Sequence, residues 1–360
     1  MSHYITPRQK VFDHLDRVVA WARGHKPGPV TLEWDLSNRC PYGCRDCHFA
    51  HTHTKGPWTK DASRRLPMLH DQGGDLADAG LVQRVLMEAR GCGVEGIVWT
   101  GGGEPTVHPQ ALEVWQAADA LGYRQGLYTL GATLTLEQAT YLRDRFAWVV
   151  VSLDAITPDT YAHEKRTPAA NFARACRAIE LLSGGHAAVG VSFLLHEKNF
   201  MQAEDMVALG RRLGATYTTL RPTIRTQPEA PNIPLGNRAW VEQALPVLDR
   251  LSTEADVEVD PDRFLQWSGW QGHPYQTCHG ISLNATITPD GRMWVCPNRR
   301  EYGDGHSLLG DLRTESFGAI WARHPGRLQV DVHCRAMCRL HPLNETLDAI
   351  HTPRRHTQFL

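Results

Sequence analysis

The stretch CPYGCRDC, residues 40–47, directly follows a β-rich segment at Val30–Leu36. It presents three cysteine thiols, those of Cys40, Cys44 and Cys47, on one short loop at the carboxyl end of a predicted strand. Cysteine thiolates hold iron–sulfur clusters, and a cluster with three protein ligands keeps one iron free for a small chelating molecule. The alternatives are a zinc knuckle or incidental buried cysteines. The spacing therefore predicts a metal centre at this loop.

From this strand onward, β-rich and helical segments alternate as far as residue 222. The six predicted strands are Val30–Leu36, Gly96–Thr100, Gln125–Leu130, Trp148–Leu153, Ala188–Leu195 and Tyr217–Leu220. The predicted helices include Leu76–Arg90, Ala111–Leu121, Leu136–Phe146, Ala169–Leu182 and Ala203–Leu213. Repeated strand–helix units favour a parallel sheet, and six units are too few for an ordinary eight-stranded barrel. We therefore expect an α/β fold, a partial (β/α)6 TIM-like barrel with its chemistry at the carboxyl ends of the strands.

Charge and composition exclude several classes of protein. The chain has 360 residues and a formal net charge of −1, so no overall field would draw it to DNA, RNA or an acidic membrane. No apolar run approaches the ~18 residues of a membrane span, and the N-terminus is polar, so we expect a cytoplasmic protein without a membrane partner. Nine cysteines without an export signal favour metal ligation over disulfides.

The segments outside the barrel differ in composition. Residues 1–28 hold an amphipathic helix at Pro7–Arg23, and residues 29–225 hold the predicted barrel. A linker with several prolines and a helix occupy residues 226–276. In residues 277–345, alternating segments flank a turn signal and predict a hairpin, so we expect a small α+β domain there and a tail at 346–360.

A glycine-rich turn, GGEP at residues 102–105, ends the second predicted strand. Glycines at a strand end let the backbone approach a ligand closely. Together with the cysteine loop, this turn resembles the motifs of the radical S-adenosylmethionine (SAM) superfamily. The resemblance implies that the cysteine loop holds a [4Fe–4S] cluster whose open iron binds SAM. It also implies that Gly102, Gly103, Glu104 and Pro105 hold the amino group of SAM.

Two further strand ends fit the same resemblance. Thr129 lies in a segment similar to the family's third-strand turn, and Ser152 and Asp154 lie in one similar to its fourth strand, where the serine contacts SAM. We therefore expect these three residues to help bind the cofactor. One residue departs from the family pattern: Asp46 stands just before the third cysteine, where the family usually has an aromatic residue near the adenine.

A second group of cysteines, Cys278, Cys296, Cys334 and Cys338, follows the predicted barrel. Four thiolates can ligate an iron–sulfur cluster or a structural zinc, and the spacing alone leaves both open. The order C-x12-G-x4-C followed by C-x3-C resembles the SPASM and shorter twitch extensions of radical SAM enzymes. The resemblance implies a twitch-like domain with a second, auxiliary [4Fe–4S] cluster.

Three candidates for catalysis lie elsewhere in the chain. Glu33 and Asp35 share one face of the first strand, where they would bind substrate, accept a proton or form a solvated or salt-bridged surface. Cys176 lies in a predicted helix. It is either a small core residue, like Cys92, or a hydrogen-atom donor to a substrate radical, as the resemblance to related epimerases implies.

The resemblance implies an enzyme that reductively cleaves SAM to a 5′-deoxyadenosyl radical, with a flavodoxin- or ferredoxin-type electron donor. The expected substrate is a sugar- or nucleotide-like small molecule, which is oxidised, epimerised or rearranged. A ribosomal peptide is one alternative, and a nucleic-acid base is another because of the basic insertion His48–Gly74. A non-enzymatic zinc or iron–sulfur scaffold is the alternative from another class.

Overall fold

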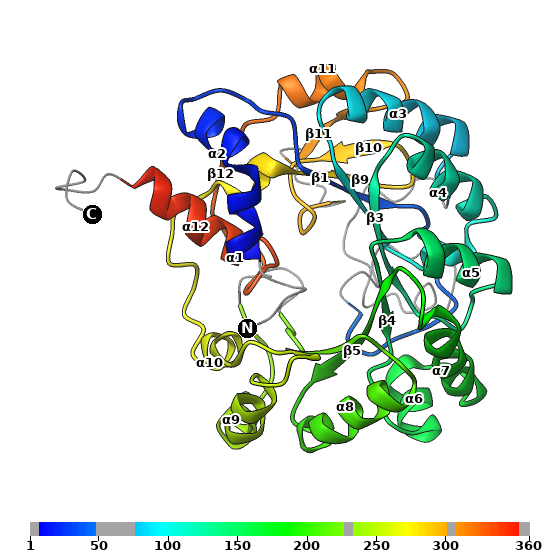
Figure 1. The fold of residues 1–360 in the computed structure, drawn as a ribbon. Helices are drawn as coiled ribbons and strands as arrows, with labels where there is room; N and C mark the ends of the chain where they lie inside the picture. Colours follow the sequence, from blue (N-terminus) through cyan, green and yellow to red (C-terminus); the bar gives the residue numbers. More distant parts are fainter. Residues whose placement is uncertain (1–6, 48–75, 227–232, 301–306, 353–360) are drawn as a thin grey trace.

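The computed structural model describes residues 7–47, 76–226, 233–300 and 307–352. Its centre is a curved sheet in which six parallel strands follow one another in chain order (Figure 1). They are β1 (Thr31–Asp35), β2 (Gly96–Thr100), β3 (Arg124–Thr129), β4 (Trp148–Ser152), β5 (Ala188–Leu195) and β6 (Tyr217–Pro222). The six predicted strands of the partial barrel are confirmed, with ends that differ by at most two residues.

Helices cover the outer face of this sheet (Figure 1). They are α3 (Ala79–Gly91), α4 (Ala111–Ala120), α5 (Leu136–Arg145), α6 (Pro158–Lys165), α7 (Ala170–Leu182) and α8 (Ala203–Arg212). Helix α3 begins later than predicted because the Asp78 carboxylate accepts a hydrogen bond from the backbone N–H of Leu81 at 2.7 Å and so caps the helix. Helix α5 begins with a capping box between Thr135 and Gln138.

The strand register separates side chains that face the helices from those that face the barrel lumen. Trp34 and Trp99 are register partners whose rings stack in the buried core beneath the helices. Because side chains alternate along a strand, Asp35 faces the lumen instead. Near the amino ends of the strands the lumen is filled by large rings: a Cβ on Gly126 would lie 2.0 Å from the Trp148 ring. The carboxyl ends are left for a cavity.

The C-terminal part of the chain extends the barrel's own sheet. Strand β9 (Asn284–Ile287) pairs in parallel with β1, and β10 (Arg292–Trp294) pairs antiparallel with β9 and with β11 (Leu308–Asp311). The predicted hairpin is thus confirmed, and it joins a sheet of ten strands. This pairing places the C-terminal segment beside the strand that leads into the cysteine loop.

The opposite edge of the sheet holds elements that the sequence did not reveal. One helix was expected between residues 226 and 276, whereas the structure has α9 (Trp240–Leu251), strand β7 (Val257–Glu258) paired with β6, and α10 (Pro261–Ser268). A two-residue strand is too short to show a hydrophobic period. Asp260 caps α10 and a proline opens its first turn, so these two residues were an available signal for that helix.

The remaining elements are α1 (Pro7–Lys10), α2 (Leu15–Ala22), α11 (Phe317–Ala322), α12 (His341–His351), the paired β8 (Thr277–Cys278) and β12 (Leu328–Gln329), and the 3-10 turns η1 (Val11–His14), η6 (Pro105–Val107), η7 (Phe200–Gln202) and η8 (Gly280–Leu283). The N-terminal helix predicted as one is therefore interrupted. Helix α12 continues past residue 345, after which the sequence predicts the C-terminal tail. In the described ranges, no helix is both long and apolar enough to cross a membrane.

Candidate active site

A cavity of about 420 Å³ lies where the barrel strands end. One side is lined by Cys40, Cys44, Cys47, Gly101, Gly102, Gly103, Glu104, Thr129, Ser152 and Asp154. The other side is lined by Arg221, Arg263, Arg335, Cys338 and Arg339. The cavity thus brings together the three loop cysteines and every predicted cofactor-binding residue except Pro105, which is buried at the start of η6.

Backbone hydrogen bonds hold the cysteine loop between α6 and the glycine turn. The N–H of Gly43 donates to the carbonyl of Lys165 at 3.2 Å. On the other flank, the N–H of Gly103 donates to the carbonyl of Ser37 at 2.8 Å. A Cβ on Gly103 would lie 2.3 Å from the carbonyl oxygen of Arg39, so only glycine permits this approach. The glycine turn is therefore packed directly on the segment that leads into the cysteines.

The loop thiols suit a metal cluster. Burial raises the pKa of Cys40 and of Cys44, so both thiols resist ionisation when no cation is nearby. A bound metal removes this penalty because its charge compensates the thiolates. The thiols of Cys40, Cys44 and Cys47 all line one cavity, which fits a cluster held by these three residues with space left for the molecule on its open iron.

Glu104 supports the glycine turn from within the protein. Its carboxylate accepts hydrogen bonds from Thr129 Oγ1 at 2.6 Å, from the N–H of Leu130 at 2.8 Å and from Thr106 Oγ1 at 2.7 Å. Burial raises the pKa of Glu104, and these hydrogen bonds oppose that rise. The side chain therefore fixes the turn between β2 and β3, and the backbone of residues 101–103 is left to face the cavity.

Asp154 has a similar supporting position at the end of β4. Its backbone has a φ of 52°, and its Oδ1 accepts a hydrogen bond from the N–H of Leu194 at 2.8 Å. Its Oδ2 pairs with Nζ of Lys165 at 2.5 Å. Burial alone would lower the pKa of Lys165, but the Asp154 carboxylate outweighs it and raises that pKa. A fixed positive charge therefore lies behind the loop cysteines, beside Cys44.

Asp46, the residue that departs from the family pattern, is fixed by an arginine from beyond β6. Arg225 donates to both carboxylate oxygens of Asp46, at 2.7 and 2.8 Å, and also to Glu197 at 3.0 Å. A bidentate pair of this kind is geometrically specific. The side chain next to the third cysteine is thus tied to the far edge of the barrel by charge instead of by aromatic packing.

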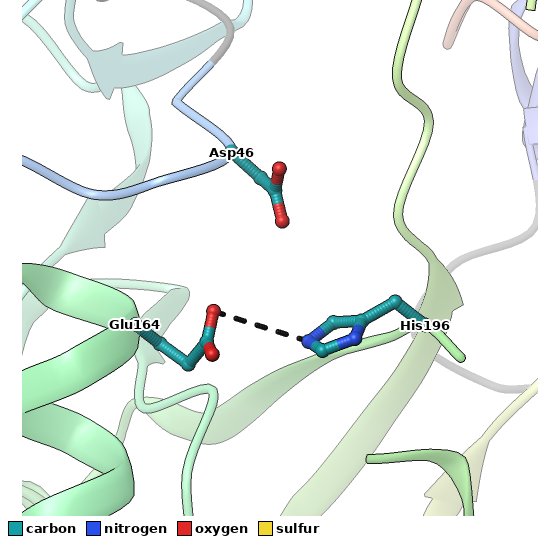
Figure 2. A group of neighbouring side chains, drawn as sticks. All are labelled: Asp46, Glu164 and His196. Atoms are coloured by element: carbon teal, nitrogen blue, oxygen red, sulfur yellow. Dashed lines mark ion pairs between the residues drawn. The ribbon is translucent and has the colours of Figure 1, made fainter. Parts of the chain in front are cut away.

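Figure 2 shows Asp46, Glu164 and His196 turned toward one shared space. His196 Nε2 lies 3.9 Å from a carboxylate oxygen of Glu164. Burial lowers the pKa of His196, which favours the neutral ring, and its Nδ1 accepts a hydrogen bond from the N–H of Lys198. The ring proton is then on Nε2, which can donate a hydrogen bond but cannot ligate a metal. The group is better suited to polar contacts than to a cation.

The four C-terminal cysteines also converge. Cys278, Cys296, Cys334 and Cys338 line one small cavity of about 20 Å³, next to the larger one. Burial raises the pKa of Cys296 to about 12, and the nearby thiols of Cys338 and Cys334 add to this rise. Burial also raises the pKa of Cys278 and of Cys338. Four clustered thiols in such a buried place fit a fully ligated metal site. Cys338 lines both cavities, so this site adjoins the candidate active site.

The two carboxylates of β1 do not line the cavity. Oδ1 of Asp35 pairs with Nη1 of Arg300 at 2.8 Å, with both side chains buried, and Glu33 pairs with Arg339. Burial raises the pKa of Asp35 to about 6, and the charge of Arg300 opposes this rise. Of the alternatives that the sequence left open, these contacts favour the salt-bridged one.

Cys176 lies in α7, packed against the core beneath the helices and away from the cavity lining, and Cys92 lies in the same core at the end of α3. The structure therefore brings neither cysteine to the other candidates. The insertion His48–Gly74 lies outside the described residues. Sequence reasoning missed the basic lining residues Lys165, Arg221 and Arg263, although a charged residue at the carboxyl end of a predicted strand is a usable signal.

Comparisons with known proteins agree with this geometry. The profile of the Radical SAM superfamily matches residues 34–209. The mycofactocin maturase MftC of Mycobacterium tuberculosis (strain ATCC 25618 / H37Rv) is 26% identical over 310 residues, which cover 81% of this chain and 70% of MftC. The PqqA peptide cyclase of Methylorubrum populi is 26% identical over 329 residues, covering 84% of this chain and 77% of the cyclase. The crystal structure of Streptococcus suis SuiB bound to S-adenosylmethionine has the same fold, with a TM-score of 0.63 at 13% identity over 89% of this chain and 72% of SuiB.

Proposed function

Because this chain belongs to the radical SAM superfamily, we propose that it is a maturase that modifies a ribosomally made precursor peptide. The family's cofactors, a [4Fe–4S] cluster and SAM, supply a 5′-deoxyadenosyl radical that takes a hydrogen atom from the substrate. The observation that carries the peptide proposal is the similarity to a peptide cyclase over 84% of the chain. This similarity reaches beyond residues 34–209, into the part that contributes the second wall of the cavity.

The relatives favour a peptide over the sugar- or nucleotide-like molecule that we expected from the sequence. The nucleic-acid alternative depends on the basic insertion His48–Gly74, whose structure is not described, so it gains no support here. A flavodoxin- or ferredoxin-type electron donor stays a prediction, as does the net reaction on the substrate.

We assign the residues by their place in the two cavities. Cys40, Cys44 and Cys47 would hold the catalytic cluster, and Cys278, Cys296, Cys334 and Cys338 the auxiliary one. Gly101, Gly102, Gly103 and Ser152 line the cavity and would contact SAM. Glu104 and Asp154 would contribute to SAM binding indirectly, since each fixes a strand end by hydrogen bonds. The protein's own task is to position the substrate carbon and exclude water.

The test uses anaerobically reconstituted protein, dithionite and SAM. We expect release of 5′-deoxyadenosine, and a mass change, seen by high-resolution mass spectrometry, in the precursor peptide encoded beside the gene. Omission of SAM is the control and should leave the peptide unchanged. If no peptide changes mass while an amino sugar or a nucleotide stimulates deoxyadenosine release, the result would support a small-molecule substrate over a peptide. Bound zinc with no deoxyadenosine would support the scaffold alternative instead.

A further inference from the structure

Acidic and basic side chains reach the cavity from different elements. Its acidic lining residues are Asp46, Glu104, Asp154 and Glu164, which all belong to the cysteine loop or to the elements that hold it. The same elements contribute Lys165, whose Nζ pairs with Asp154 at 2.5 Å. The lining arginines come from β6, from α10 and from the C-terminal segment that includes Cys338, and none of the four acidic lining residues belongs to these elements. The lining arginines therefore form a basic group that comes from a different part of the chain.

Arg221 is the part of this basic group that belongs to the barrel. It lies on β6 in register with Leu194 of β5, and both residues line the cavity. Its side chain is half-buried. Among the residues that the structure describes, none offers its guanidinium a hydrogen-bond acceptor or a carboxylate. Within the described part of the chain, the five N–H donors of this guanidinium are therefore available to a ligand in the cavity.

Arg263 of α10 lies close to Arg221. Its Nη2 donates to the carbonyl of Met337 at 3.0 Å, while its Nε is buried and has no hydrogen-bond partner in the described part of the chain. Burial lowers the pKa of the Arg263 guanidinium, and the neighbouring charge of Arg221 lowers it further. Cys338 and Asp260 oppose this effect only in part. Two like charges therefore lie near each other where water is partly excluded, and an anion bound between them would offset their repulsion.

The other two arginines of this wall have partners. Nη2 of Arg335 donates to the carbonyl of Ile224 at 2.9 Å, and Arg339 pairs with the buried Glu33. These contacts hold the C-terminal segment against the barrel. Arg221 is therefore the guanidinium of this wall that is most available to a ligand within the described part of the chain, and Arg263 is its neighbour on α10.

We propose that Arg221 and Arg263 together bind a carboxylate of the peptide substrate, an inference that rests on the proposed function. A carboxylate accepts two parallel hydrogen bonds from a guanidinium fork, and its charge relieves the repulsion between the two arginines. A substrate held there would share the cavity with the glycine turn and the cysteine loop. The pair is a specificity determinant, because a neutral group would leave both guanidinium groups unpaired.

The carboxylate is either the C-terminus of the peptide or an Asp or Glu side chain, and small probes distinguish the two without a precursor peptide. Phenylglyoxal reacts with guanidinium groups, and peptide mapping by mass spectrometry reports its rate at each arginine of the holoenzyme. N-acetylglycine represents a C-terminus, N-acetylaspartate α-amide represents a side chain, and N-acetylglycinamide is the uncharged control. We expect at least one of the two carboxylates to slow labelling of both Arg221 and Arg263, and the uncharged amide to have no effect.

Variants identify the residues that provide this protection. Arg221→Gln should lower the affinity of the carboxylate probe by about 10- to 100-fold, as measured by the protection of Arg263. This is the loss expected when a charged hydrogen bond is removed. Arg221→Lys should fall between this variant and the wild type, because it keeps the charge but loses the fork. Arg212→Gln, which removes an exposed arginine on α8, is the control for net charge and should leave protection unchanged.

Several outcomes would overturn the assignment. Equal protection by the uncharged amide, or protection by inorganic phosphate alone, would exclude carboxylate recognition. A loss of SAM affinity in Arg221→Gln would assign the pair to the cofactor's own carboxylate. A loss of iron in Arg263→Gln with protection intact would mean that Arg263 serves the neighbouring Cys338 site. The proposed function can fail separately. If carboxylates protect both arginines but no peptide is modified, the anion site is supported and the maturase function is refuted.

Discussion

The two cysteine sites of this protein are built in opposite ways. Cys40, Cys44 and Cys47 lie within one loop of eight residues, so their spacing alone predicts a shared metal centre. The other four come from β8, from the segment after β10 and from the loop before α12. They meet only because β9 and β10 join the barrel's sheet and β12 pairs with β8. A local motif can be recognised from the sequence, whereas a dispersed one depends on the packing that assembles it.

The two sites are nevertheless physically connected. Arg300 follows Cys296 closely in the sequence and pairs with the buried Asp35 of β1, the strand that leads into the cysteine loop. The pairing of β9 with β1 adds a backbone connection between the same two parts. Damage at one site can therefore reach the other through β1, and the following experiments measure how independent the sites are.

The largest effect is expected from Cys44→Ala, which removes one of the three proposed ligands of the local site. Deoxyadenosine release from SAM should fall to background, because no open iron is left to bind SAM. The iron content should fall by about half, from about eight irons per chain to about four, if the C-terminal site is assembled independently. Iron analysis and liquid chromatography of the SAM products measure both. Deoxyadenosine release at the wild-type rate would contradict the assignment of this loop.

Cys278→Ala combined with Cys296→Ala tests the dispersed site. The iron content should again fall by about half, while deoxyadenosine is still released from SAM, because the loop cluster is intact. Peptide modification should be lost if the auxiliary cluster takes part in the reaction. Cys92→Ala is the matched control, since this thiol lies outside both cavities, and it should change neither quantity. Unchanged iron in the double variant would refute the auxiliary site.

Arg300→Met tests the connection between the two sites. It leaves the carboxylate of Asp35 buried without its partner, which costs about 3–5 kcal/mol of folding free energy and should lower the melting temperature. The pKa of Asp35 is already about 6, and the loss of Arg300 raises it further.

The destabilisation should therefore depend on pH in a defined direction. At pH 5 the Asp35 carboxyl of the variant is protonated and can be buried without charge, whereas at pH 8 a charge must be buried or a proton taken up. We expect a larger loss of melting temperature at pH 8 than at pH 5, measured by anaerobic scanning calorimetry. The second substitution Asp35→Asn should remove most of this difference, and an equal loss at both pH values would show that Asp35 is not the cause.

The smallest effect is expected at the ion pair that connects the cysteine loop to the segment after β6. Asp46→Asn removes a partly exposed bidentate pair with Arg225, worth about 1 kcal/mol, and should weaken SAM binding several-fold because the loop is held less firmly. Arg225→Gln should have a similar effect, and the double variant should be little worse than either single one. Glu197→Gln, at the weaker partner of Arg225, is the control. Additive losses would indicate that Asp46 and Arg225 act independently.

Much of the fold could be predicted because its signals are local. The alternation of strands and helices gave β1 to β6 with ends correct to within two residues, and capping residues such as Asp78 account for the helix that began late. The elements that the sequence did not reveal are short or cross a predicted boundary: β7 has two residues, and α12 continues past residue 345. Such elements are determined by what they pack against, so a hydrophobic period does not reveal them.

The sequence by itself determined the parallel barrel, the cysteine loop and the glycine turn, because strand period, cysteine spacing and glycine positions act over a few residues. Only the tertiary structure decided how the charges are arranged. It turned Glu33 and Asp35 toward arginines from the C-terminal segment, tied Asp46 to Arg225, and placed Arg221 beside Arg263. Such pairs join residues far apart in the chain, and their energies depend on burial and distance, which no local pattern encodes.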